Sequence, residues 1–268
     1  MAARFRRTPR EVLQDLWEQY GPPIQFLVLV VALWELAAWA LQIPDWLLPP
    51  PHRVARRVLE ARNLWLHTRV TLSEALAGFA LSATLGPIVA AGIANMKFLE
   101  RGVFPYIVLA NAVPIVAIAP LLTVWLGYGI APKIAVAMII TFFPIVTNTA
   151  RGFTSADYRI IRMMHSLNAS GFEIFRKIQV PTALPYIFAG FKISLSLSLI
   201  GAVVGEFYGG GDKGLGYLIT VTAAQLDTPL LFVAVGILAV SGVGFFQITA
   251  LFERRFIYWA TQDVAEQR

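Results

Sequence analysis

Six long apolar segments determine what this chain can fold into. Each reaches the roughly 17–25 apolar residues that an α-helix needs to cross a bilayer. Charged residues make up only 14% of the chain, against about 25% in ordinary soluble domains, which excludes a soluble globular protein. We therefore predict an all-α, polytopic membrane helix bundle with about six transmembrane helices. The predicted spans are Ile24–Ile43, Val70–Ala94, Phe104–Gly127, Ala131–Ala150, Leu184–Phe207 and Pro229–Phe252.

Lysine and arginine are distributed unevenly over the connections between these spans. With the N-terminus inside, 14 of them fall on the inner side and 7 on the outer side. Cytoplasmic connections of membrane proteins collect such residues, so both termini are predicted to be cytoplasmic. The net charge of +6 fits this bias without a nucleic-acid partner. The predicted organisation is a cytoplasmic N-terminal segment 1–23, a transmembrane domain 24–252 that includes a cytoplasmic loop 151–183, and a cytoplasmic tail 253–268.

One connection, residues 44–69, carries five arginines although it falls on the predicted outer side. It also carries apolar residues that could share one face of a helix while the arginines face water. We interpret this segment as an amphipathic helix on the outer surface; the alternative is that the first span is misplaced. The residues of the predicted apolar face are Val54, Val58, Ala61, Leu64 and Trp65.

Two of the spans carry a small residue at every fourth position. Small residues at this spacing let the backbones of neighbouring helices approach closely, so both spans are predicted to pack tightly in the bundle. The residues are Gly78, Ser82, Gly86 and Ala90 in the second span, and Gly190, Ser194, Ser198 and Ala202 in the fifth, followed by a second row of Gly201, Gly205 and Gly209.

The sequence carries no signature of a catalytic or metal site. The glycine-rich stretch Gly209–Gly216 is not a phosphate-binding loop because Lys213 is followed by Gly214 rather than by Ser or Thr, and we interpret it as a turn. The three histidines are scattered without metal-ligand spacing, and the chain has no cysteine. We therefore expect a chain that is not an enzyme and binds no cofactor of its own.

Three glutamates, Glu35, Glu74 and Glu206, lie within or at the ends of the spans. Carboxylates in a membrane are costly enough to suggest a function. For Glu74 and Glu206 the alternative is an interfacial carboxylate anchored by water or an N–H group, and Glu35 is predicted to pair with another helix. Interhelical hydrogen bonding is likewise an alternative role for polar residues deeper in the spans. The candidates for a polar path or its gate are Asn111, Ser194, Ser198 and Glu206.

The segment Asp157–Pro185 is the longest basic, polar interval between two apolar runs. Its pattern predicts two short amphipathic helices with a break between them. In the second helix Glu173 and Lys177 are placed to pair at i,i+4. Pro181 and Pro185 are predicted to end this helix before the fifth span begins. Two such helices offer a surface for a partner to push against.

The end of this segment, Ile178-Gln179-Val180-Pro181, resembles the close of a loop motif in the inner-membrane permeases of binding-protein-dependent ABC importers. The motif reads Glu-Ala-Ala, three residues, Gly, nine residues, Ile-x-Leu-Pro. In this alignment Asn168 stands at the motif's glycine, and Arg162, Met163 and Met164 stand at its Glu-Ala-Ala. The sequences TALPYIFAGFKIS, AVVGEF, GLGYLI and LFERRF resemble the nitrate, sulfonate and taurine branch of that family, and the similarity covers most of the chain.

The resemblance implies a translocation subunit that works by alternating access in the bacterial inner membrane. Its implied partners are a second copy of itself, two cytoplasmic ATPase subunits that bind ATP and Mg, and an external solute-binding protein. It further implies a coupling helix at Ile160–Ala169 that docks into the ATPase, with Met163, Met164 and Leu167 as buried anchors. The residues assigned to this contact are Ile160, Arg162, Met163, Met164, Leu167, Asn168, Ala169 and Gly171.

The stretch MMHSLNASGFEIFRKIQVP resembles family members that carry vitamin precursors more closely than it resembles the sulfonate members. A pyrimidine or riboflavin is therefore the expected kind of solute, with a sulfonate, taurine, nitrate or similar anion as the alternative. A stand-alone channel or secondary transporter is the alternative of a different class. That alternative predicts an ion- or proton-linked carboxylate in mid-membrane and no need for a docking loop.

Overall fold

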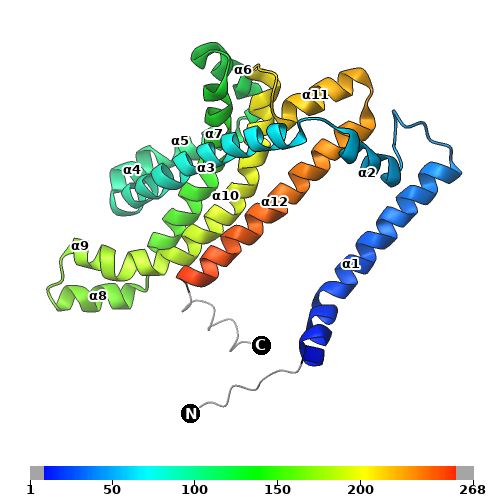
Figure 1. Cartoon of the computed structure of the whole chain (residues 1–268). Coiled ribbons are helices and arrows are strands. Elements are labelled where there is room, and N and C mark those ends of the chain that lie inside the picture. Colours follow the sequence, from blue (N-terminus) through cyan, green and yellow to red (C-terminus); the bar gives the residue numbers. More distant parts are fainter. Residues whose placement is uncertain (1–8, 258–268) are drawn as a thin grey trace. The chain divides into compact units, whose positions relative to one another are not determined.

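The computed structural model describes residues 9–257, and the outermost parts of the predicted terminal segments, 1–8 and 258–268, lie outside the described residues (Figure 1). Within residues 9–257 the regular elements are all helices. Five of them are long and apolar enough to cross a membrane, or six if one bent pair counts as a single span, which confirms the predicted all-α membrane fold. The elements are α1 (Pro9–Ala40), α2 (Pro51–Glu60), α3 (Leu64–Asn95), α4 (Lys97–Gly102), α5 (Phe104–Ala112), α6 (Ile115–Leu126), α7 (Ile130–Thr154), α8 (Tyr158–Ser166), α9 (Gly171–Ile174), a π-helical segment (Phe175–Gln179), α10 (Val180–Tyr208), α11 (Leu215–Gln225) and α12 (Thr228–Phe256).

The chain divides into two compact units. The first consists of residues up to 62 together with 222–233, and the second consists of residues 63–221 together with those from 234 onward. Helices α11 and α12 therefore contribute one end to each unit.

The first unit is held together by polar contacts made by charged residues of α1 and α2. Glu35 of α1 accepts a hydrogen bond from the backbone N–H of His52, and its carboxylate lies 2.6 Å from Nδ1 of that histidine, as expected for a glutamate paired with another helix. Arg57 donates to Asp227 over 2.6 Å, and this hydrogen bond raises the pKa of Arg57. Arg53 pairs with Asp45. Two arginines of the basic 44–69 segment are thus neutralised within the unit.

The amphipathic helix predicted within residues 44–69 is shorter than expected. It is confirmed as α2, but this helix ends at Glu60 because Ala61 takes an extended conformation, with φ −71° and ψ 131°. Asn63 then lies in the left-handed region, with φ 61°, where asparagine is better tolerated than most residues. Leu64 and Trp65 begin α3 instead, so their placement on the same surface helix was wrong.

Helix α7 is the centre of the second unit and packs against both α3 and α10 (Figure 1). The small-residue faces of these two helices meet it. A Cβ atom on Gly78 would lie 2.5 Å from Cβ of Ala137 and 2.8 Å from the backbone N of Met138. A Cβ atom on Gly201 would lie 2.6 Å from Cα of Ala137. The predicted close approach of backbones is therefore confirmed.

We expect Gly78→Leu to destabilise the chain by about 1–3 kcal/mol, because its side chain would have to displace the backbone of α7. Gly244→Leu is the matched control, since nothing lies within 4 Å of a Cβ atom at that glycine. The measurement is the yield of monodisperse protein and its melting temperature in detergent. Equal stability of the two variants would contradict the proposed packing of α3 on α7.

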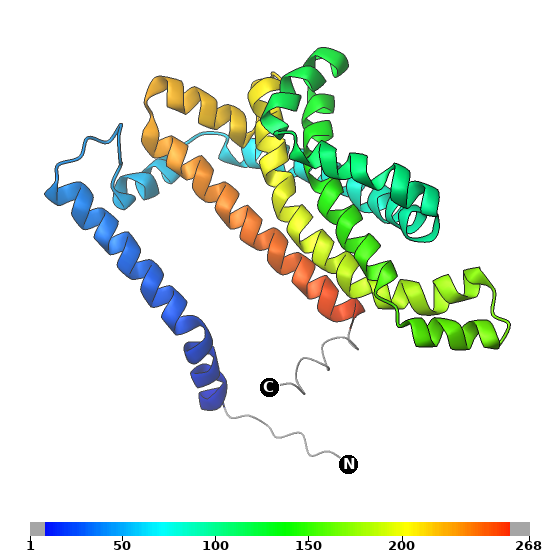
Figure 2. The same ribbon diagram turned by 180° about the vertical axis from the view of Figure 1, so that it is seen from behind.

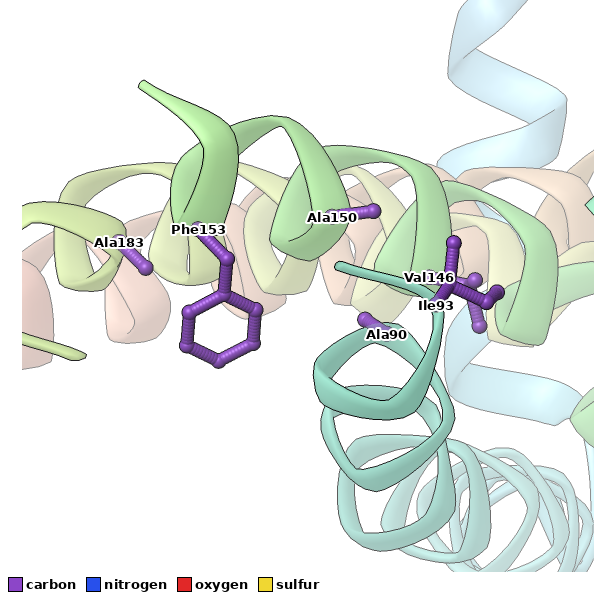
Figure 3. Packing of buried hydrophobic residues seen from close by; sticks show 6 residues of the cluster. All are labelled: Ala90, Ile93, Val146, Ala150, Phe153 and Ala183. Carbon is purple, nitrogen blue, oxygen red and sulfur yellow. The ribbon is translucent and has the colours of Figure 1, made fainter. Parts of the chain in front are cut away.

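A hydrophobic cluster fixes one end of the contact of α7 with α3 and α10 (Figure 3). Phe153, near the end of α7, is only 4% exposed, and its ring centroid lies 5.3 Å from that of Phe175 in the π-helical segment. This cluster therefore anchors the end of α7, which leads into α8, and the start of α10, which follows α9 and the π-helical segment. Its members are Ala90, Ile93, Val146, Ala150, Phe153 and Ala183.

The span predicted at Phe104–Gly127 is not one continuous helix. The chain turns by 102° between α5 and α6. The break falls at Val113 and Pro114, where Val113 has φ −77° and ψ 125°. A proline disfavours the helical conformation of the residue before it and removes a backbone N–H, which explains the break.

The prediction that Pro181 and Pro185 end a helix before the fifth span was wrong. Residues Gly171–Tyr208 form one continuous helical stretch of 38 residues. The π-helical segment Phe175–Gln179 directly precedes the first proline. Pro185 lies inside α10 itself, as membrane helices allow when neighbouring groups satisfy the freed backbone carbonyl, so neither proline ends the stretch. Helix α9 is therefore joined to α10 without a hinge loop.

Candidate functional site

Helices α8 and α9 form a hairpin that projects beyond the ends of α7 and α10, as both views show (Figure 2). Local hydrogen bonds fix where each helix begins. The carboxylate of Asp157 accepts from the backbone N–H of Arg159 over 2.7 Å. Ser170 and Glu173 form a reciprocal capping box at the start of α9, and Glu173 also accepts from Lys177 over 3.0 Å, which confirms the predicted pair.

The turn between α8 and α9 explains why asparagine stands at the motif's glycine position. The backbone N–H groups of Leu167 and Ala169 donate to the carbonyl groups of Met163 and Met164, which closes the end of α8. Asn168 lies between them with φ 59°, in the left-handed region. Glycine adopts this conformation without strain, and asparagine tolerates it better than most residues. Asn168 therefore preserves the turn that a glycine would make.

Apolar side chains are exposed along the hairpin, although polar residues surround them. Ile160, Met163 and Leu167 of the predicted contact have exposed fractions of 41%, 55% and 70%. Phe172, which the sequence analysis did not assign to the contact, is 70% exposed at the start of α9. Met164 and Ala169 are half-buried, whereas Arg162 lies over the ring of Tyr158 at 4.9 Å. We call the residues Ile160, Met163, Leu167 and Phe172 the hairpin surface.

A second feature is a cavity of about 710 Å³ at the elbow between α5 and α6, closed on one side by α7. Its walls are apolar apart from a few polar groups, among them Asn111 of the candidate path. Residues that shape it include Tyr106, Asn111, Pro114, Ile118, Met138 and Phe142.

The other path candidates lie elsewhere in the second unit. Ser194 donates to the carbonyl group of Thr141 in α7 over 3.0 Å, and Ser198 donates to Leu195 of its own helix over 2.7 Å. Both serines are fully buried and neither lines the cavity. The structure therefore does not bring Ser194 and Ser198 together with Asn111, and the bond of Ser194 is an interhelical one.

Glu206, the fourth path candidate, belongs to a buried polar cluster at the end of α10. Its carboxylate accepts hydrogen bonds from the hydroxyl group of Thr71 and the backbone N–H of Gly216, each over 2.5 Å. Nearby, Nζ of Lys133 lies 3.2 Å from a carboxylate oxygen of Glu74. An N–H group thus anchors the Glu206 carboxylate, as in one of the alternatives considered for it. This carboxylate is buried, however, and only 5% of Glu206 is exposed.

Lys133 was not predicted to belong to a site, because it was counted among the residues of an outer connection. The structure buries this lysine, leaving it 5% exposed. Space for it is made by glycines of α10: a Cβ atom on Gly205 would lie 2.6 Å from Cα of Lys133. The sequence did contain a signal for this cluster. Glu74, Lys133 and Glu206 all lie near span ends that the predicted topology places on the same side of the membrane.

The glycine-rich stretch after α10 is a turn, as predicted, and Glu206 determines its sequence. A Cβ atom on Gly214, which has φ 116°, would overlap the Glu206 carboxylate. A Cβ atom on Gly216 would lie 2.8 Å from Oε2 of Glu206. Only glycine therefore lets the start of α11 close over this carboxylate.

Comparison with known proteins gives a consistent result. Residues 82–258 match the family described as binding-protein-dependent transport system inner membrane component. The chain is 37% identical to the riboflavin transport system permease protein RibX of Chloroflexus aurantiacus, over 91% of each chain. It is 31% identical to the formylaminopyrimidine transport permease protein ThiX of Halalkalibacterium halodurans, over 88% of this chain and 95% of that protein.

More distant matches agree with these. A putative aliphatic sulfonates transport permease protein of Bacillus subtilis is 26% identical over 86% of this chain. Among solved structures, an inward-facing conformation of the MetNI methionine ABC transporter superposes with a TM-score of 0.61 and 18% identity, covering 72% of this chain and 97% of that chain. The chain therefore belongs to the inner-membrane components of binding-protein-dependent transport systems, in the branch of the riboflavin, pyrimidine-precursor and sulfonate permeases, and is the permease subunit of an ABC importer.

Proposed function

We propose that this permease couples to its ATPase through the hairpin surface. The observation that carries the proposal is the exposure of four apolar side chains on a hairpin that projects from the second unit. Apolar groups of this kind form the energetic centre of protein interfaces when a partner excludes water from them. The site consists of the eight residues assigned above from the family motif, together with Phe172.

The connections of the hairpin support a mechanical role. At one end α9 continues through the π-helical segment into α10, and at the other only three residues separate α8 from α7. A partner that displaces the hairpin therefore displaces α7 and α10 directly. These two helices reach the elbow cavity and the buried polar cluster, so ATP-driven motion of the partner would rock the bundle between two arrangements.

The topology follows from this role. The hairpin surface faces the cytoplasm, as does the loop 151–183 that contains it, and both termini lie on the same side. The N-terminal segment 1–23 and the tail 253–268 are then cytoplasmic, and the transmembrane domain spans 24–252. The functional assembly is a homodimer of this chain in the bacterial inner membrane, with two ATPase subunits that bind ATP and Mg below it and a binding protein outside.

Within the membrane, the translocation path runs beside the elbow cavity, where Asn111 is the polar contact. Ser194 and Ser198 act by fixing α10 in the bundle, and Glu206 acts by fixing the turn after α10. An apolar cavity with few polar groups suits a flat, weakly charged solute better than a small anion. This supports a vitamin precursor such as riboflavin or a pyrimidine as the transported solute, and a sulfonate or similar anion is the second candidate.

Reconstitution tests the coupling proposal. The full chain is inserted into liposomes with its ATPase, its binding protein is added outside, and uptake is measured. We expect uptake only when ATP and Mg are supplied to the ATPase side. Uptake that needs no ATPase would overturn the proposal in favour of a stand-alone channel or secondary transporter.

The solute is tested separately with the cognate binding protein. Calorimetric titration with riboflavin, formylaminopyrimidine and taurine compares the candidate classes directly. We expect a heterocyclic vitamin precursor to bind and taurine not to bind. The reverse result would assign the permease to the sulfonate type without affecting the coupling proposal.

A further inference from the structure

Three charged side chains are enclosed in the second unit, and their charges do not balance. Glu74, Lys133 and Glu206 are 1%, 5% and 5% exposed. Two carboxyl groups therefore lie with one ammonium group in a buried site. A buried charge without a partner costs several kcal/mol, so a cluster with both carboxylates ionised would carry one unfavourable negative charge.

The hydrogen bonds identify which carboxyl group is ionised. Glu206 accepts from the Thr71 hydroxyl group and from the backbone N–H groups of Gly216 and Tyr217, the last over 3.3 Å. Three donors on one carboxylate stabilise its charged form. Nothing comparable surrounds Glu74.

Glu74 makes one contact with a donor and leaves one oxygen unsatisfied. Its Oε1 lies 3.2 Å from Nζ of Lys133. Its Oε2 is buried and has no hydrogen-bond partner. Thr71, one turn before Glu74 on the same helix, donates to Glu206, so the two carboxyl groups belong to one buried site. A proton on the unsatisfied oxygen of Glu74 would turn it from an acceptor without a donor into a donor.

We propose that Glu74 and Glu206 form a proton-binding site, in which a proton on Glu74 Oε2 is donated to the Glu206 carboxylate. The proton, taken up from water, gives the unsatisfied oxygen a partner. It also brings the cluster to zero net charge, with Glu206 balanced by Lys133. Two carboxyl groups this close hold one proton between them because both cannot ionise cheaply.

The proposed proton-binding site joins residues of four helices. Glu74 belongs to α3, Lys133 to α7 and Glu206 to α10, and Gly216 lies in the first turn of α11. Loss of the proton leaves two carboxylates repelling each other beneath the turn Gly209–Gly214, which then loosens. The protonated pair Glu74 and Glu206, which we call the clasp, thus holds the start of α11 in a pH-dependent way.

The other ionisable groups around the clasp are few among the described residues. His67 of α3 contacts the backbone of Gly214 through Nδ1 and stacks on Tyr217. Asp212 and Lys213 lie on the turn and are exposed. A pH response of the clasp must therefore be separated from a response of His67.

The test compares the melting temperature of the full chain with that of Glu74→Gln in detergent, from about pH 6 to about pH 10. Glutamine has the shape of the protonated carboxyl group and donates to Glu206 at every pH. We expect the wild-type melting temperature to fall by about 5 °C or more as the pH rises, and that of Glu74→Gln to stay level over the same range. His67→Gln is expected to keep the wild-type response. A Glu74→Gln variant that responds like the wild type would overturn the proposal.

Infrared spectroscopy provides a second readout that does not depend on the stability of any variant. The wild type at neutral pH should show the C=O stretch of a buried protonated carboxyl group, and this band should disappear at high pH. Glu206→Gln should lack the band, because Glu74 then ionises against Lys133. Absence of the band from the wild type overturns the proposal. So does a melting temperature that follows the sodium concentration rather than the pH, since a bound sodium ion would then balance the charge.

Discussion

Leu167→Asp is expected to abolish association of this permease with its ATPase while leaving membrane insertion intact. Leu167 is 70% exposed and sits at the tip of α8, so a charge there faces water in the free chain and costs little. In the complex the same charge would be buried in an apolar contact. Residues at the centre of an interface contribute about 2 kcal/mol or more, so we expect at least a roughly thirtyfold loss of affinity. Co-purification and ATP-dependent uptake measure the effect.

Ser166→Asp is the matched control for this prediction. Ser166 is exposed one residue earlier on the same helix, its hydroxyl group bonding back to the carbonyl group of Arg162. The substitution adds the same charge outside the hairpin surface, and association should be largely retained. If Leu167→Asp associates normally, the hairpin surface is not the ATPase contact. If both variants lose association equally, charge rather than apolar docking is responsible.

Lys133→Met is expected to destabilise the second unit strongly. Lys133 is paired with Glu74 in the buried cluster, and methionine fills similar space without charge. Removing one partner of a buried ion pair costs about 3–5 kcal/mol because the other charge is left uncompensated. The variant should therefore show a strongly reduced melting temperature and a low yield of folded protein.

The turn after α10 offers a control that removes the same charge. Lys213 is exposed there, and Lys213→Met should leave the melting temperature within about 1 °C of the wild type, since exposed charges contribute little to stability. Equal stability of Lys133→Met and the wild type would show that Lys133 does not balance the buried carboxyl groups.

Most of the fold could be predicted because bilayer thickness sets a length that apolar runs must match. Two of the exceptions are at prolines. Pro114 breaks a predicted span, whereas Pro181 lies within a continuous helix, although each lacks a backbone N–H. Before Pro181 the helix continues through a π-helical segment in which Phe175 packs on Phe153. Sequence periodicity carries no information about that contact.

The candidate site was predictable where it is local and not where it is assembled from distant elements. The hairpin surface follows from residues within one segment, so helical spacing was enough to find Ile160, Met163 and Leu167. The buried cluster joins Glu74, Lys133 and Glu206 across three helices. Charge counting placed Lys133 in water because it treats every residue near a span end as exposed. Only the glycines of α10, which allow α7 to approach, reveal that this lysine is enclosed.

The uninterrupted helical stretch Gly171–Tyr208 has a thermodynamic consequence. At about 1.5 Å per residue it is a rod of roughly 50–60 Å, with the hairpin surface at one end and Glu206 near the other. If the two ends are coupled through this rod, the coupling free energy between them acts equally in both directions. If ATPase docking tilts the rod, the proton affinity of the glutamate pair must shift with it. Protonation of that pair must then alter the affinity for the ATPase by an equal factor.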